Sequence, residues 1–171
     1  MKSTLLSLSM TENLSLVYWV SLYLVIFAVP LVLSGPQLVV GTVVNACLFI
    51  AAKQTTTSKL IPLAILPSLA AIMHGVVLGS FSQFLLIMAP FIWVSNFILM
   101  VVYKQTNQKL IGLPLASLAK TAWLFSIAFL LVNLGVLPKI FLTSMGVFQL
   151  ATALLGGSLA LILASIMERK A

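Results

Sequence analysis

The residues that could do chemistry in this chain are few, and nearly all of them are polar without being charged. They are scattered through long apolar stretches: Gln37, Asn45, His74, Gln83, Trp93, Asn96, Asn133 and Gln149. A polar side chain is costly inside a bilayer unless it faces other helices or water, so these positions are the best indicators of function. Amide, imidazole and indole groups can hold a small solute by hydrogen bonds and apolar contacts.

Two interpretations of these polar residues remain open. In the first, they line a pocket that is open to the outside and captures a small solute, either neutral or anionic. In the second, they only hydrogen-bond between helices, which stabilises a bundle by about 0.6 kcal/mol per contact on average. Several of them are expected at one level near the outer helix ends, and this convergence gives the pocket as much weight as simple packing.

The residue types do not favour catalysis or metal binding. The only acidic residues, Glu12 and Glu168, are expected at cytoplasmic helix ends, so no carboxylate inside the membrane is available for acid–base chemistry or proton coupling. A single cysteine, Cys47, excludes a disulfide within the chain and a multi-cysteine metal or iron–sulfur site. No glycine-rich phosphate loop is present. We therefore expect no enzyme activity, no metal and no cofactor.

Composition identifies the elements that must position the polar residues. Of 171 residues, 62% are hydrophobic, and nine basic residues face two acidic ones. This is too little charge to cover the surface of a soluble domain. Continuously apolar stretches of about 20 residues predict membrane helices, because membrane strands would alternate. The predicted spans, within one domain of residues 1–171, are 14–34, 37–52, 60–79, 81–103, 113–137 and 147–167.

The connections between the predicted spans differ in charge. Ser34–Pro36 and Gly79–Ser80 are tight uncharged breaks, whereas Lys53–Lys59 and Lys104–Lys109 are polar loops with basic ends, and both termini are basic as well. The positive-inside rule puts these basic segments in the cytoplasm. Pro138–Gly146 is expected to be an outer loop or a short interfacial helix. The sequence thus predicts an all-α integral membrane protein of the cell membrane, a bundle of six transmembrane helices with both termini cytoplasmic. We attribute its net charge of +7 to basic residues on the cytoplasmic side of the lipid bilayer, and we expect no nucleic-acid partner.

Two predicted helices combine an outer glutamine with small residues. In the second span, Gln37, Gly41 and Asn45 follow at steps of four and share one face. In the sixth span, Gln149 precedes a seam of small residues: Gly156, Ala160 and Ala164. Such a seam lets another helix approach closely, so it could pack within the bundle or dock a partner membrane protein.

Lys120 is the one basic residue inside a predicted span. We expect its long stem to reach the cytoplasmic surface, and a contact with an anion is the alternative. Pro67 and Pro90 predict kinks in the third and fourth spans, and Trp93 follows the second of these kinks near mid-membrane. No obvious inverted repeat is visible.

The chain resembles a family of small six-helix prokaryotic membrane proteins. The similarity covers most of the chain and rests on five segments: Pro36–Ala46, Leu66–Ser68, Ala89–Asn96, Ala116–Lys120 and Gln149–Gly157. Members of this family sometimes carry an iron-hydrogenase label, which a chain with one cysteine does not support.

In size, helix number and topology the chain is also similar to the substrate-binding S components of energy-coupling-factor (ECF) vitamin transporters. This likeness implies capture of a micronutrient from outside, with energy supplied by a separate membrane coupling protein and ATPases. The first helix departs from that group, because Tyr23, Phe27 and Leu31 are bulky where an alanine-spaced docking seam is common. The alternative function is a structural or assembly subunit of a membrane complex, with the seam of the sixth span as its interface.

Overall fold

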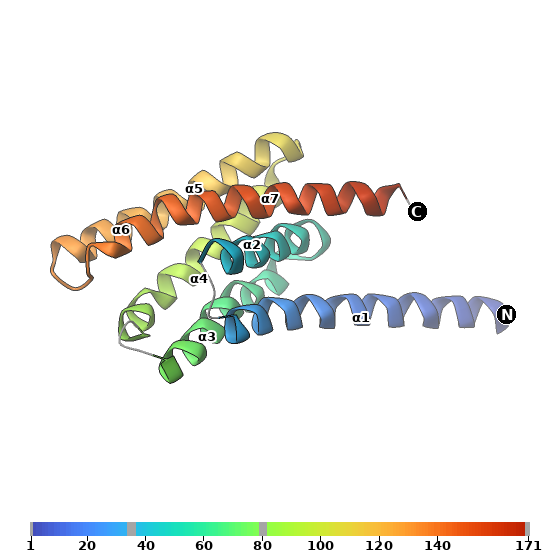
Figure 1. Cartoon of the computed structure of the whole chain (residues 1–171). Coiled ribbons are helices and arrows are strands. Elements are labelled where there is room, and N and C mark those ends of the chain that lie inside the picture. Colours follow the sequence, from blue (N-terminus) through green and yellow to red (C-terminus); the bar gives the residue numbers. More distant parts are fainter. Residues whose placement is uncertain (1, 34–36, 79–81, 170–171) are drawn as a thin grey trace.

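The computed structural model describes residues 2–33, 37–78 and 82–169, and every element within these ranges is helical. The long helices are α1 (Lys2–Val32), α2 (Gln37–Gln54), α3 (Leu60–Leu78), α4 (Ser82–Gln105), α5 (Lys109–Asn133) and α7 (Val147–Glu168). Two short elements, the 3-10 turn η1 (Thr57–Lys59) and α6 (Ile140–Met145), lie in connections. Figure 1 shows that the start of α1 and the end of α7 lie at the same end of the bundle.

Five segments in the described ranges are long and apolar enough to cross a membrane. They are Gln37–Gln54, Thr57–His74, Phe84–Gln105, Lys109–Asn133 and Ile140–Met167. The apolar part of α1, Leu16–Val32, is shorter. The prediction of an all-helical chain is therefore confirmed for the described residues, and several of its helices are long and apolar enough to span a membrane.

The helix bounds differ from the predicted spans at several ends. α1 begins at Lys2, before the predicted start at residue 14, and α5 covers 109–133 where 113–137 was predicted. The segment expected as an outer loop or short helix contains α6. α3 and α4 continue as helices through Pro67 and Pro90, so neither proline interrupts its helix. The predicted breaks at Ser34–Pro36 and Gly79–Ser80 lie outside the described residues.

α5 ends earlier than its hydropathy predicts, because Gly135 adopts a backbone conformation that ends the helix. Gly135 has a φ of 72°, which is strained for residues that carry a Cβ. Its N–H donates to Val132 O at 3.0 Å, and the N–H of Val136 donates to Leu131 O at 2.9 Å. This pair of bonds is the Schellman arrangement, which satisfies the last carbonyls of a helix. The chain then turns toward α6.

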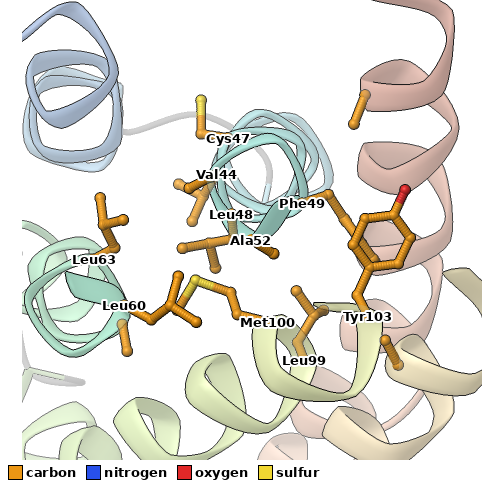
Figure 2. Packing of buried hydrophobic residues seen from close by; sticks show 14 of the residues in the cluster. Val44, Cys47, Leu48, Phe49, Ala52, Leu60, Leu63, Leu99, Met100 and Tyr103 are labelled. Carbon is orange, nitrogen blue, oxygen red and sulfur yellow. The ribbon is translucent and has the colours of Figure 1, made fainter. Parts of the chain in front are cut away.

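Two apolar clusters fill the bundle at different levels. In the first, Leu48, Leu60 and Met100 meet between α2, α3 and α4, as Figure 2 shows. The second joins α4, α5 and α6 through residues such as Met88 and Leu124. Along both α4 and α5, the chain passes from one cluster to the other, and buried polar residues lie between them: Ser95 and Asn96 on α4, and Ser117, Lys120 and Thr121 on α5.

Candidate functional site

Lys120 lies near the middle of α5 and is 3% exposed. Its Nζ donates hydrogen bonds to Asn45 Oδ1 of α2 at 2.7 Å and to Asn96 Oδ1 of α4 at 2.8 Å. The expectation that its stem reaches the cytoplasmic surface is wrong. The start of α5 at Lys109 is about 16 Å away along the helix axis at 1.5 Å per residue, and the side chain instead turns toward two neighbouring helices.

The two asparagines extend this contact to further helices. Asn45 Nδ2 donates to Thr152 Oγ1 of α7 at 3.1 Å, and the Thr152 hydroxyl donates to the carbonyl oxygen of Gln149 at 3.1 Å. Asn96 Nδ2 donates to the carbonyl oxygen of Ala64 in α3 at 3.0 Å. We name Lys120, Asn45, Asn96 and Thr152 the Lys120 cluster. Its side chains are all buried, and its hydrogen bonds join α2, α3, α4, α5 and α7.

The Lys120 cluster forms a polar layer between the two apolar clusters. On α4, Asn96 lies between Met88 of the second cluster and Leu99 of the first. On α5, Lys120 lies between Ala116 of the first cluster and Leu124 of the second. The polar layer therefore lies near the middle of helices that are long enough to span a membrane.

The electrostatics of this layer are unusual because the lysine has no acidic partner among the described residues. Burying an ammonium group costs several kcal/mol even after the protein relaxes. Hydrogen bonds from a charged donor return about 1.5–3 kcal/mol each, and Lys120 makes two of them to neutral amide oxygens. An ammonium group carries three N–H donors, so the two amides do not use its full capacity.

Close packing of α2 against α7 supports the cluster. A Cβ placed on Gly41 would lie 2.8 Å from Thr152 Cγ2, and one placed on Gly156 would lie 2.6 Å from the carbonyl oxygen of Thr42. Only glycines permit this approach. The part of the predicted seam at Gly156 is thus occupied by α2 of the same chain, while Ala160 is buried and Ala164 is half-buried.

Asn45 and Asn96 occupy equivalent positions in a sequence repeat. The segment Lys53-Gln54-Thr55 follows Asn45 at the same spacing as Lys104-Gln105-Thr106 follows Asn96, with an offset of 51 residues between the copies. The sequence Lys-Leu-Ile then recurs near the start of the second helix of each copy, as Lys59-Leu60-Ile61 where η1 meets α3 and as Lys109-Leu110-Ile111 at the start of α5, with an offset of 50 residues. The repeated unit is a helical hairpin, α2–α3 in one copy and α4–α5 in the other.

Contacts between the two hairpins follow this repeat. Lys53 Nζ donates to the carbonyl oxygen of Thr106 at 2.8 Å, and Lys104 Nζ donates to the carbonyl oxygen of Thr55. Equivalent residues of the two copies thus exchange equivalent hydrogen bonds, as they do around a two-fold axis. Lys53 also lies 5.0 Å above the ring of Tyr103. We name these reciprocal bonds of Lys53 and Lys104 the loop clasp, and they hold the two predicted cytoplasmic loops together.

Lys120 breaks the symmetry of the repeat at its centre. It bonds both equivalent asparagines, yet it belongs to one copy only. The residue at the matching distance after Lys59 is Ala70, which is fully buried. One lysine therefore serves two equivalent amides. This repeat is visible in the sequence once the loops Lys53–Lys59 and Lys104–Lys109 are aligned. It is the signal that would have connected Asn45 with Asn96.

Among the other predicted site residues, those whose side chains the structure describes do not join the Lys120 cluster through them. Gln37 Nε2 donates to the carbonyl oxygen of Ser144 at 3.0 Å, and His74 Nδ1 donates to that of Leu31 at 2.7 Å. Trp93 Nε1 donates to Ser68 Oγ. The remaining three residues divide by exposure: Asn133 is exposed, Gln149 is half-buried, and the side chain of Gln83 lies outside the described residues. Among the side chains that the structure describes, no three of the types His, Cys, Asp and Glu form a group able to hold a metal ion.

Comparisons with known proteins add no neighbour, since no family model, curated protein or solved structure matches the chain.

Proposed function

We propose that the chain is a transport subunit embedded in the cell membrane, which binds a small solute between its helices and carries it across the bilayer. The observation that carries the proposal is the buried bridge from Lys120 to Asn45 and Asn96 at mid-depth of the helices. Ionisable residues inside membrane bundles are rare and commonly mark a solute or ion path. Six spans with both termini in the cytoplasm belong to this proposal.

The hairpin repeat supports the same function. In many membrane transporters the solute site lies near the bilayer midplane, at the interface between repeated units. The Lys120 cluster fits this description, because Asn45 and Asn96 are equivalent residues of the two hairpins and lie near mid-helix. Relative movement of the two hairpins would then expose the cluster to one side of the membrane at a time.

The source of energy belongs to a partner in this proposal. Neither acidic residue of the chain lies within α2 to α5, so the repeated hairpins contain no carboxylate for proton coupling. An S-component-like subunit fits this composition, because it takes a neutral or anionic micronutrient from outside and relies on a membrane coupling protein with ATPases. The solute would enter at the end opposite the loop clasp.

The alternative function, a structural or assembly subunit, depends on a surface available to a partner. The seam of α7 was the expected interface, and at Gly156 it packs against α2 of the same chain. A buried lysine that has no acidic partner among the described side chains also adds no benefit to a purely structural bundle, since well-packed apolar side chains stabilise an interior at least as well. We therefore favour solute binding.

The experiment that tests this function identifies what the protein binds. Wild-type protein, Asn96→Ala and the exposed control Lys139→Ala are purified from membranes in mild detergent, and extracted small molecules are compared by mass spectrometry. We expect one solute with the wild type and with Lys139→Ala, and its loss from Asn96→Ala. If none of the three proteins retains a solute, and cells expressing wild type or Asn96→Ala accumulate the same metabolites, the structural-subunit alternative is correct.

A further inference from the structure

We infer that the solute is an anion and that the ammonium group of Lys120 binds it. This inference rests on the proposed function and narrows its solute to small molecules with a carboxylate or another oxyanion group.

The first argument is the missing counter-charge. The described partners of Lys120 are amide oxygens alone. Of the two acidic residues of the chain, Glu168 is the last residue of α7, and Glu12 of α1 precedes the apolar part of that helix, Leu16–Val32. A buried charge is normally paired with an opposite charge. An anionic solute would supply that charge and make the ammonium form of Lys120 stable at this depth.

The second argument is the set of donors at this level. Lys120 uses two of its three N–H donors. The NH₂ groups of Asn45 and Asn96 each donate one bond, to Thr152 Oγ1 and to the carbonyl oxygen of Ala64, and each has a second N–H. The next residue of α5, Thr121, has a buried Oγ1 with no hydrogen-bond partner among the described residues. Oxyanions have several acceptor sites and are bound by such groups of donors.

The third argument is that a neutral solute would not require a buried lysine. A neutral solute could be held by the two asparagines and Thr152 without any ionisable residue. Ala70, which occupies in the first hairpin the position that Lys120 occupies in the second, has no charge. The bundle nevertheless places one lysine between both asparagines, at the cost of burying its charge. A cation at this point discriminates between anionic and neutral solutes, which amides alone do poorly.

The test measures anion binding directly on the whole purified chain. The thermal unfolding midpoint in detergent is recorded with sodium chloride, nitrate, sulfate, phosphate, acetate and succinate at constant ionic strength. The proteins compared are wild type, Lys120→Met, and the exposed control Lys139→Met. We expect at least one anion to raise the midpoint of wild type and Lys139→Met by about 5 °C at saturation, and to bind Lys120→Met at least about tenfold more weakly.

A second variant guards against a general folding defect. Asn45→Asp keeps the shape of the side chain and puts a carboxylate beside Lys120, and the Thr152 hydroxyl can rotate to donate to it. The lysine then has an internal counter-charge. We expect this variant to fold with unchanged or higher thermal stability and to lose the response to anions.

The outcomes separate this inference from the function on which it rests. A copurified solute without negative charge, or an anion response that persists in Lys120→Met and Asn45→Asp, would refute the inference that Lys120 binds an anionic solute. Either result would still be consistent with the proposed solute binding. If the wild type shows no anion response and retains no solute, both the inference and the proposed function are refuted.

Discussion

Replacing Gly156 with alanine tests whether the close approach of α2 and α7 builds the Lys120 cluster. The added Cβ would lie 2.6 Å from the carbonyl oxygen of Thr42, and 2.8 Å from both the Ala46 nitrogen and the Asn45 Cβ. The first two are backbone atoms and cannot rotate away. To restore ordinary contacts beyond 3.4 Å, the two helices must separate by roughly 0.6 to 0.8 Å.

The expected loss of stability follows from this geometry. Forcing one extra methyl group into a closely packed interface costs about 1–3 kcal/mol. The same separation would stretch the 3.1 Å bond from Asn45 to Thr152 past the range of a hydrogen bond, which costs about 1 kcal/mol more. We therefore expect Gly156→Ala to lower the free energy of unfolding by about 2–4 kcal/mol.

The measurement is an unfolding titration with a denaturing detergent, followed by helical circular dichroism. Two matched variants on α7 serve as controls. In Gly157→Ala the new Cβ meets side-chain atoms of Leu113 and Phe49, which can move aside, so its loss should be smaller. Ser158→Ala changes an exposed position and should leave stability within about 0.5 kcal/mol of wild type.

One result would refute the reasoning. If Gly156→Ala is as stable as wild type, or if Gly157→Ala loses more stability, backbone contact between α2 and α7 does not limit their approach. The Lys120 cluster would then depend on other contacts.

Further predictions use the same titration. Asn45→Ala and Asn96→Ala should each lower the free energy of unfolding by about 2 kcal/mol, because each removes one Lys120 bond and one bond of its own amide. Lys53→Ala and Lys104→Ala should each cost less than about 1 kcal/mol, since the loop clasp is partly exposed to solvent and its two bonds are equivalent. Gly135→Ala should cost about 1–2 kcal/mol, because alanine is strained at a φ of 72°.

Each of these predictions has an opposing result. A loss confined to one of the two asparagines would contradict a lysine shared equally by the repeated hairpins. A large loss for Lys53→Ala beside none for Lys104→Ala would show that the clasp is not reciprocal. An unchanged stability for Gly135→Ala would mean that the turn after α5 adopts another conformation in the variant.

Much of the fold could be predicted from composition and spacing. The long apolar stretches predicted helices, and the basic ends of the loops Lys53–Lys59 and Lys104–Lys109 predicted that both loops lie on the same side of the membrane. In the structure, the reciprocal bonds of Lys53 and Lys104 join these two loops. Bounds were less accurate where a local backbone motif overrides hydropathy, as at Gly135, which ends α5 although the following residues are still apolar.

The candidate site was only partly predictable. Asn45 and Asn96 were recognised as polar residues in apolar helices, but their grouping with distant glutamines was based on expected height alone. Two residues at one height can face opposite sides of a bundle. Asn45 and Asn96 meet Lys120, whereas Gln37 contacts the backbone of α6 and Asn133 is exposed at the end of α5.

The sequence by itself determined that this chain is built from apolar helices with basic connections, because the length of an apolar run and the position of charges are properties of the chain alone. Only the tertiary structure decided where the ammonium group of Lys120 goes. Position along a helix sets the depth of a residue, but the packing of neighbouring helices sets which way it faces. Here the glycine contacts between α2 and α7, together with the repeated hairpins, put two amide oxygens within reach of one buried lysine.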